Sequence, residues 1–380
     1  MHPTESSPST TSRRALLGGA AALTAGTALW GANRHPQHPA RPSSPPPRTL
    51  AVPRQAGIDT PQQTHLAMLA YDHCGPTGPE GAAALRDMLV GWTRAVTGQP
   101  LTANLGIGPA LPARLPLAVP AGFRELPPLP GDRLESRRSG ADLLVQLSGD
   151  EPEAIAAVAD ALDRQCRGLV APRWRQWGHL LPSPAGQTPR NLFAFKDGTA
   201  NPGPADDRWI WLADAPYAGA TFLVYRRIAM AVDTFEAQPI EQQEAVIGRH
   251  RDDGRPLGGA KEHDEPDFYA KTPDGRYVIP ATAHIRLANP RLDGGARMLR
   301  RGYTYADGPD EKGLLFCAYM KDPALFVRIQ QRMAEHDALT RFTEHRASAV
   351  LYLPPGAPKG APLGDGLFGR PATGDRPQGT

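Results

Sequence analysis

The chain has 380 residues, of which 40 % are hydrophobic, enough to bury a sizeable core and to build two or three domain-sized units. Its 42 Lys and Arg nearly balance its 39 Asp and Glu. The net charge of only +3 gives no basic surface of the kind that binds nucleic acid. The cysteines Cys74, Cys166 and Cys317 are too far apart for a Cys-x-x-Cys motif. We expect the three cysteines to be buried apolar residues, although one disulfide between two of them remains possible.

The N-terminus has the pattern of an export signal. Arg13 and Arg14 precede an apolar stretch rich in Ala and Gly, and no acidic residue follows Glu5 before that stretch ends near Ala32. The pattern resembles a twin-arginine signal. A membrane anchor is the alternative, but this stretch is short and weakly apolar for a span of ~20 residues. We expect residues 1–32 to be a signal peptide, with the protein exported to the cell envelope, the periplasm or the exterior.

A Pro-rich segment, residues 33–52, has no apolar periodicity and is predicted to be a linker, and residues 369–380 are predicted to be a flexible tail. Between them, strand-like and helix-like patterns alternate. Strands are predicted at 65–71, 142–147, 221–231 and 313–320, and helices at 81–96, 150–164, 234–248 and 324–336. This order suits an α+β protein with two units, 53–190 and 191–368, each an antiparallel sheet covered by helices.

The stretch NLFAFKDGTANP, residues 191–202, brings a strand-like apolar run to Lys196 and Asp197 and then to a turn led by Gly198. Ordinary turn chemistry explains an Asp-Gly pair equally well. Two later segments are also rich in polar groups: AHIRLANPR at 283–291 and MLRRGYTY at 298–305. Hydrolase, Walker, HExxH and copper-oxidase HxH signatures are absent from the sequence.

Four further segments accompany these three along the chain: QAGIDTPQQTHLA at 55–67, IGRHRDDGRPLGG at 247–259, GLLFCAYMKD at 313–322 and SAVLYLPPG at 348–356. Together they resemble the dye-decolorizing peroxidase family, in particular its exported, deferrochelatase-like branch. The resemblance covers nearly all of residues 50–368. It implies a dimeric α+β barrel of two ferredoxin-like units, with one haem b between them.

The resemblance also implies the principal site residues. His284 takes the family's position for the proximal ligand of the haem iron, because a haem peroxidase needs one axial imidazole. Asp197 matches the distal aspartate, which moves a proton between the two peroxide oxygens. Arg300 matches the distal arginine, which stabilises the charge on the departing oxygen and on a ferryl intermediate. Arg301 is the alternative for that role.

The resemblance implies further haem contacts, from residues that match positions where members of the family contact the haem. Arg291 is the expected propionate partner. Leu314 and Phe316 alternate onto one face of a strand, where they either roof the distal pocket or belong to an ordinary core. The other expected haem contacts are Gly198, Thr199, Ala200, Asn289 and Pro290.

The chain departs from the family pattern at Ala194, where the family has glycine. We expect a slightly tighter or shifted turn there and retained activity. The ring nitrogen of His284 that points away from the iron needs a hydrogen-bond acceptor, and Asp322 and backbone carbonyls are the candidates. Six aromatic residues are either core residues, the better prediction, or electron relays: Trp174, Trp177, Trp209, Trp211, Tyr303 and Tyr305.

The leading hypothesis is a secreted haem peroxidase that reduces hydrogen peroxide and oxidises dyes, phenolics or metal ions. Its expected partners are hydrogen peroxide and a bulky aromatic or metal-ion electron donor, and we expect no nucleic acid partner. We expect no stable membrane span after processing, and a homo-oligomer is possible. The alternative is a haem- or iron-handling protein that releases iron from haem or oxidises ferrous iron for uptake. A non-enzymatic assembly module of the cell envelope is the third hypothesis.

Overall fold

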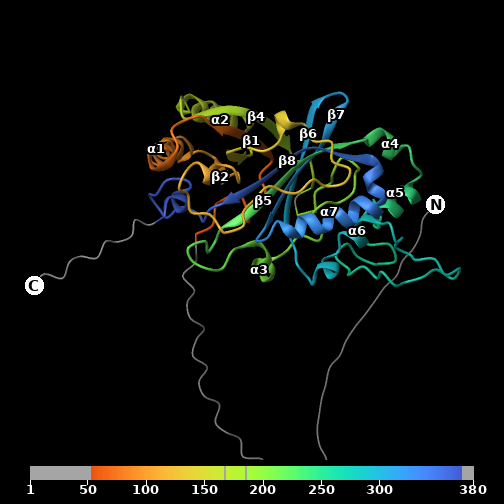
Figure 1. The fold of residues 1–380 in the computed structure, drawn as a ribbon. Helices are drawn as coiled ribbons and strands as arrows, with labels where there is room; N and C mark the ends of the chain where they lie inside the picture. The colour runs from red at the N-terminus through yellow and green to blue at the C-terminus, as the bar shows by residue number, and fades with distance from the viewer. Residues whose placement is uncertain (1–52, 167, 185, 370–380) are drawn as a thin grey trace, which may run out of the picture. The chain divides into compact units, whose positions relative to one another are not determined.

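The computed structural model describes residues 53–166, 168–184 and 186–369 (Figure 1). The predicted signal peptide, the predicted linker and almost all of the predicted tail lie outside these residues. Within them, none of the helices has the length and hydrophobicity needed to cross a membrane.

Eight antiparallel strands form a closed barrel (Figure 1). The first four strands and their two long helices are β1 (His65–His73), α1 (Gly78–Val96), β2 (Leu101–Ile107), β3 (Leu143–Gly149), α2 (Pro152–Gln165) and β4 (Val170–His179). The second four are β5 (Thr221–Met230), β6 (Leu299–Gly308), β7 (Glu311–Met320) and β8 (Thr343–Leu353). Their connections hold α4 (Val232–Glu236), α5 (Ile240–Ile247), α6 (His284–Leu287) and α7 (Ala324–His336), and α3 (Asp207–Ile210) precedes β5.

The two halves of the barrel have the same topology. The strands run in the order β4-β1-β3-β2 in the first half and β8-β5-β7-β6 in the second. Both are the order fourth, first, third, second, with a helical connection after the first and the third strand of each half. This repetition confirms the expected α+β fold of two ferredoxin-like units. The boundary predicted at residues 190 and 191 falls in the connection between β4 and β5.

The halves meet at two narrow seams. At one seam β2 pairs with β8 only through Ile107 and Tyr352, and at the other β4 pairs with β6 only through His179 and Thr304. Side chains reinforce the second seam, where Gln176 Nε2 of β4 donates to Asp307 Oδ1 of β6 at 3.0 Å. A barrel joined by so few backbone pairs has room for a cavity beside that seam.

The barrel interior is filled with side chains. Because residues alternate between the two faces of a strand, Leu315, Cys317 and Tyr319 of β7 point inward, where they pack in one buried cluster with Tyr303 and Tyr305 of β6. The outer faces are covered by helices. Trp92 of α1 is fully buried and donates to the Leu162 carbonyl of α2 at 3.1 Å, and α7 packs Leu325 and Phe326 against β5, β7 and β8. The even-numbered residues of β6 and β7 therefore face outward.

Most predicted elements are confirmed, with three corrections. The helix predicted at 234–248 is two short helices, because Pro239 lacks the backbone N–H that a helix interior needs. The run Leu192 to Phe195 is a turn rather than a strand, with Ala194 N–H donating to the Asn191 carbonyl at 2.9 Å. Strands β2, β4, β6 and β8 were not predicted.

The three cysteines are free thiols. Cys166 and Cys317 are buried as predicted, whereas Cys74 is exposed, so the prediction was wrong for that residue.

Candidate functional site

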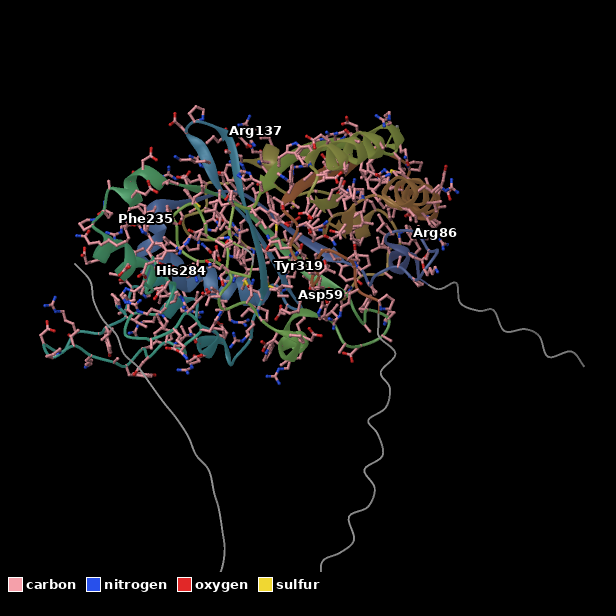
Figure 2. The ribbon with its side chains drawn as sticks, turned by 180° about the vertical axis from the view of Figure 1, so that it is seen from behind. Asp59, Arg86, Arg137, Phe235, His284 and Tyr319 are labelled. Carbon is pink, nitrogen blue, oxygen red and sulfur yellow. The ribbon has the colours of Figure 1, made fainter. Side chains whose placement is uncertain are left out.

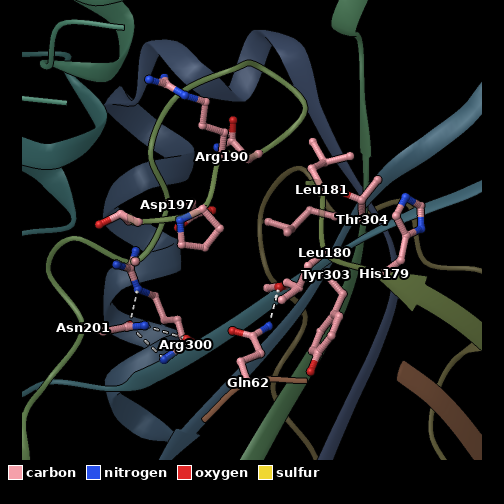
Figure 3. Close-up of a pocket in the computed structure, with 16 residues that line it drawn as sticks. Gln62, His179, Leu180, Leu181, Arg190, Asp197, Asn201, Arg300, Tyr303 and Thr304 are labelled. Carbon is pink, nitrogen blue, oxygen red and sulfur yellow. Dashed lines mark hydrogen bonds between the residues drawn. The ribbon is translucent and has the colours of Figure 1, made fainter. Parts of the chain in front are cut away.

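A cavity of ≈ 220 Å³ lies beside the seam between β4 and β6 (Figure 3). Its walls come from the segment before β1, the end of β4, the connection to β5, and strands β6 and β7. Four predicted site residues line it: Asp197, Gly198, Arg300 and Leu314. Other lining residues include Gln62, His179, Arg190, Asn201, Gly302, Tyr303 and Thr304. The cavity thus collects one carboxylate, two guanidinium groups and an imidazole among amide, hydroxyl and apolar groups.

Asp197 presents a free carboxylate to this cavity. Its backbone N–H donates to the Pro189 carbonyl at 2.8 Å, and its side chain has no hydrogen bond or ion pair with any described residue. The next residue, Gly198, has φ 121°, a backbone conformation that side chains other than glycine's rarely adopt. A Cβ at Gly198 would meet Asn201 Nδ2 at 3.7 Å, an ordinary contact, so backbone conformation rather than space requires the glycine.

Lys196, the neighbour of Asp197, is held on the other side of the chain. Its ammonium donates to Glu262, which also accepts from Thr188 Oγ1 at 2.5 Å and Thr199 Oγ1 at 3.0 Å. Burial raises the pKa of the Glu262 carboxyl, but these hydrogen bonds outweigh burial and lower the pKa below its ordinary value. The lysine of the KDGT sequence therefore anchors the turn, and the aspartate is left free.

Arg300 and Arg301 leave β6 on opposite sides. Asn201 Nδ2 donates to the Arg300 carbonyl at 2.8 Å, and Asn201 Oδ1 accepts from Arg300 N at 3.1 Å and Nε at 3.4 Å (Figure 3). Arg301 is buried and donates to the carbonyls of Ile58 and Thr60 at 2.8 and 2.6 Å. Of the two arginines, Arg300 is the one that lines the cavity. The sequence reasoning did not identify Asn201, although it lies within the GTANP motif.

His284 begins α6, near the α7 helix, at the end of the molecule that also holds Phe235 (Figure 2). Its Nδ1 lies 2.7 Å from Oδ2 of Asp337, whose side chain is fully buried. The other Asp337 oxygen accepts the Leu339 N–H at 2.8 Å. The acceptor for the far imidazole nitrogen is therefore Asp337. The suggestion of Asp322 was wrong, because Asp322 Oδ1 accepts the Ala324 N–H at the start of α7.

Asp337 also controls the charge state of His284. Burial lowers the pKa of the imidazole, but the charge and the hydrogen bond of Asp337 outweigh burial, so the pKa is raised above its ordinary value. The charges of Arg300 and Asp197 also act on this pKa, which puts both groups within electrostatic reach of His284. His284 is not among the cavity-lining residues, but its side chain is 25 % exposed, and Nε2 has no partner among the described residues.

Of the remaining predicted contacts, all but Leu314 lie away from the cavity lining. Thr199 turns toward Glu262, and Ala200 is exposed. Asn289 Oδ1 accepts the Arg291 N–H at 2.9 Å, and Pro290 begins the short 3-10 turn that follows. The Arg291 side chain is 59 % exposed and pairs with Glu265 at 3.0 Å. Leu314 lines the cavity, whereas Phe316 packs 6.1 Å from the Phe326 ring under α7.

Most of the six aromatic residues are core residues, as predicted. Trp174, Trp211, Tyr303 and Tyr305 belong to the cluster inside the barrel, and Trp209 packs against it. Trp177 is exposed and lines a second cavity of ≈ 190 Å³, which shares His179 with the first.

The charges around the site fit a haem. Arg190, Arg249 and Arg300 have no carboxylate partner among the described residues, and the first two donate only to backbone carbonyls. A haem carries two propionates, which compensate positive charge of this kind. The imidazole of His284 is held at Nδ1 by a buried carboxylate and has no partner at Nε2 among the described residues, so its chemistry fits that of a histidine that would hold a haem iron. No cluster of three or more His, Cys, Asp or Glu among the described residues is arranged to bind a metal ion directly.

Comparisons with known proteins give a consistent result. The family models for the N-terminal and C-terminal parts of Dyp-type peroxidases match residues 55–180 and 188–358. The chain is 31 % identical over 350 residues to a deferrochelatase of Yersinia pseudotuberculosis, with 80 % of each chain covered. It is 37 % identical over 269 residues to a dye-decolorizing peroxidase of Thermobifida fusca, a match that covers 66 % of this chain and 62 % of that protein.

Solved structures agree with these matches. A DyP-type peroxidase from Streptomyces coelicolor aligns with a TM-score of 0.77 and 33 % identity, covering 82 % of this chain and 94 % of that one. An oxyferrous complex of DtpA from Streptomyces lividans aligns with a TM-score of 0.76 and 33 % identity, covering 82 % and 95 %. The motifs, the duplicated fold and these matches lead to one conclusion: the chain belongs to the Dyp-type peroxidase family.

Proposed function

We propose that this protein is a haem b peroxidase that reduces hydrogen peroxide at the site formed by His284, Asp197 and Arg300. The observation that carries the proposal is electrostatic and geometric. The Asp197 carboxylate and the Arg300 guanidinium line one cavity and form no ion pair with any described residue, and their charges act on the pKa of an imidazole whose Nδ1 is held by a buried aspartate. Membership of the Dyp-type peroxidase family supports this assignment.

Each residue has a defined part in the proposal. His284 would hold the haem iron through Nε2, and Asp337 accepts from Nδ1 and so fixes the tautomer that leaves Nε2 available. The Asp197 carboxylate takes the proton from one peroxide oxygen and returns it to the other, the leaving oxygen. The Arg300 guanidinium stabilises negative charge on the leaving oxygen. A bound haem would supply the redox chemistry, that is, the reducing equivalents that cleavage of the O–O bond requires.

Reconstitution with haem b tests the proposal. Asp197→Asn should slow the reaction with peroxide by ~10²-fold or more, the usual contribution of a positioned acid–base group, and leave the haem bound. His284→Ala should instead weaken haem retention. Asp310→Asn and His336→Ala, on the hairpin after β6 and at the exposed end of α7, are matched controls that should behave like the parent. If both site variants also behave like the parent, the proposed roles are wrong.

The electron donor in this proposal is a dye, a phenolic compound or a metal ion. Oxidation of such a donor by the reconstituted protein, at a rate that depends on peroxide, is the measurement that checks it.

A second function, release of iron from haem, has support from the similarity to a deferrochelatase. The two functions differ in what happens to the haem. A peroxidase turns over peroxide many times with its haem intact, whereas an iron-releasing protein yields free iron and an intact porphyrin with negligible peroxide turnover. Counting peroxide molecules consumed per porphyrin freed of iron distinguishes them.

We also propose export through the twin-arginine route, based on Arg13 and Arg14. Replacing both arginines with lysine should retain the protein in the cytoplasm, which cell fractionation measures.

A further inference from the structure

Glu262 binds three residues of the segment that carries Asp197. Its carboxylate accepts from Thr188 and Thr199, which lie on either side of Asp197 in the chain, and from the ammonium of Lys196. The Lys196 and Glu262 side chains are only 12 % and 16 % exposed. This carboxylate lies 66 residues from Lys196 in the sequence, outside the seven segments quoted for the family resemblance.

The backbone directs Lys196 and Asp197 to opposite sides. Lys196 forms a bridge with Arg190, so it is locally extended, and successive residues of an extended segment point in opposite directions. Accordingly, Asp197 lines the cavity and Lys196 does not. Lys196 is nevertheless the sequence neighbour of Asp197. Because the lysine side chain is long and flexible, its ammonium can turn toward the Asp197 carboxylate if it has no other partner.

The position of Glu262 is itself well fixed. Its carbonyl accepts from Arg249 Nη1 at 2.8 Å, and the same nitrogen donates to the Gly254 carbonyl at 2.7 Å. Gly254 closes over the stem of Lys196, since a Cβ there would lie 2.7 Å from Lys196 Cδ. The Lys196 ammonium is therefore enclosed with one carboxylate partner, and that carboxylate comes from the β5–β6 connection, which also carries His284.

We propose that Glu262 is a positioning residue that keeps the Lys196 ammonium away from the Asp197 carboxylate, so that Asp197 stays free for proton transfer. This inference rests on the proposed function of Asp197. It assigns Glu262 no contact with peroxide or haem. Without Glu262, the ammonium pairs with Asp197 and the acid–base group is lost from the cavity.

The test uses three variants of the haem-reconstituted full chain. Glu262→Ala should bind haem like the parent and react with peroxide about 10- to 100-fold more slowly, the range expected when a catalytic group is displaced. Adding Lys196→Met, which keeps the aliphatic stem and removes the charge, should restore the rate to within about threefold of the parent. Glu262→Gln, which retains the shape and the acceptor for the threonines, should be slow for the same reason if Glu262→Ala does not fold. The control Glu241→Ala, on the exposed side of α5, should react at the parental rate.

A structure of the haem-free Glu262→Ala protein gives a readout independent of activity. It should show Lys196 Nζ within about 4 Å of the Asp197 carboxylate, the limit for an ion pair. A parental rate for Glu262→Ala, or a double variant as slow as the single one, would overturn the inference. Asp197→Asn measured in parallel separates the two proposals: if it is slow while Glu262→Ala is normal, only the role of Glu262 is wrong, and if it is as fast as the parent, the proposed function itself is wrong.

Discussion

Ala194 occupies a backbone position that favours glycine. Its φ is 63°, the single positive value among non-glycine residues in the described part of the chain. The added methyl group was expected to tighten or shift this turn, and the structure shows that the turn keeps a left-handed residue. Its conformation is held by Arg190 Nη1, which donates to the Ala194 carbonyl at 2.6 Å.

Ala194→Gly should therefore stabilise the protein by about 0.5–1 kcal/mol, because relief of the left-handed strain exceeds the entropy that glycine adds to the unfolded chain. Urea denaturation measures the change. Ala200→Gly, in the same loop but without a positive φ, should be neutral or destabilising. An equal gain from both substitutions would show that the backbone of Ala194 is not strained.

The hydrogen bond from His284 to Asp337 predicts a specific effect on haem binding. Asp337→Asn keeps the shape but removes the negative charge that orients the imidazole and raises its basicity. Haem affinity should fall by about 10- to 100-fold, the usual effect of losing such a partner. Asp322→Asn, at the other end of α7, should bind haem like the parent. Haem titration followed by absorption measures both, and equal affinities would contradict the role of Asp337.

Asn201 forms hydrogen bonds with the main chain and the guanidinium of Arg300. We therefore expect a substitution of Asn201 to affect the peroxide reaction more than haem retention. Asn201→Ala should slow that reaction about 10-fold or more, because a displaced charge stabilises the leaving oxygen poorly. Asn201→Asp retains the acceptor for Arg300 N and Nε and should recover part of the rate. Stopped-flow mixing with peroxide measures the effect, and a parental rate for Asn201→Ala would show that Arg300 does not depend on this clamp.

The contact between α7 and β8 contains a partly buried histidine whose ring nitrogen Nδ1 is shielded from solvent. His345 of β8 accepts from Gln330 Nε2 of α7 at 3.3 Å, and its Nδ1 has no partner among the described residues. Burial, followed by the charge of Arg226, lowers the pKa of His345 to about 3. In the unfolded chain His345 is protonated as the pH falls through about 6.5, whereas in the folded chain it is not. The contribution of His345 to the free energy of unfolding is therefore fully present well above pH 6.5 and is lost progressively below it.

The free energy of unfolding should fall by roughly 1.5–2 kcal/mol between pH 6.5 and 5 because of His345 alone. His345→Gln, which cannot be protonated, should lose correspondingly less over the same interval. Denaturant titrations at both pH values make the comparison. If the parent and the variant show the same pH dependence, His345 does not resist protonation in the folded protein.

Elements with strong patterns were predictable from the sequence, and those shaped by tertiary contacts were not. The bounds of α7 follow from its helical periodicity, and β5 and β7 from their apolar runs. Strand β4 escaped prediction because Pro172 lies near its start and four of its ten residues are Arg, Gln or His, so it lacks an apolar run; its pairing, mostly with β1, makes it a strand. The helix expected at 234–248 was interrupted by Pro239, a signal present in the sequence and overlooked.

The same distinction holds within the site. Asp197, His284 and Arg300 could be predicted as site residues because each lies in a quoted motif. The structure shows that Arg300, and not Arg301, lines the cavity. Glu262 and Asp337 were missed because an isolated carboxylate has no periodicity or spacing that reveals a partner 66 or 53 residues away. Arg291 illustrates the converse, since a motif position alone does not show that its side chain is exposed and paired with Glu265.

At the scale of the whole barrel, the two halves share one topology but differ in their connections. The first half joins its strands mainly through α1 and α2, which cover the outer face of its sheet. The second half has a long connection between β5 and β6, which supplies both His284 and Glu262, while Asp197 comes from the connection that joins the halves. The duplicated sheets form the scaffold, and these two connections build the site on the outer face of the second one.

We propose that His284 would hold the haem iron and that Asp197 and Arg300 would serve the reaction with peroxide. The most direct test is the absorption spectrum of the protein reconstituted with haem b, recorded before and after one equivalent of hydrogen peroxide. We expect one haem per chain, with a Soret band that changes rapidly on mixing in the parent and slowly in Asp197→Asn. A protein that binds no haem, or a Soret band that peroxide leaves unchanged, would contradict it.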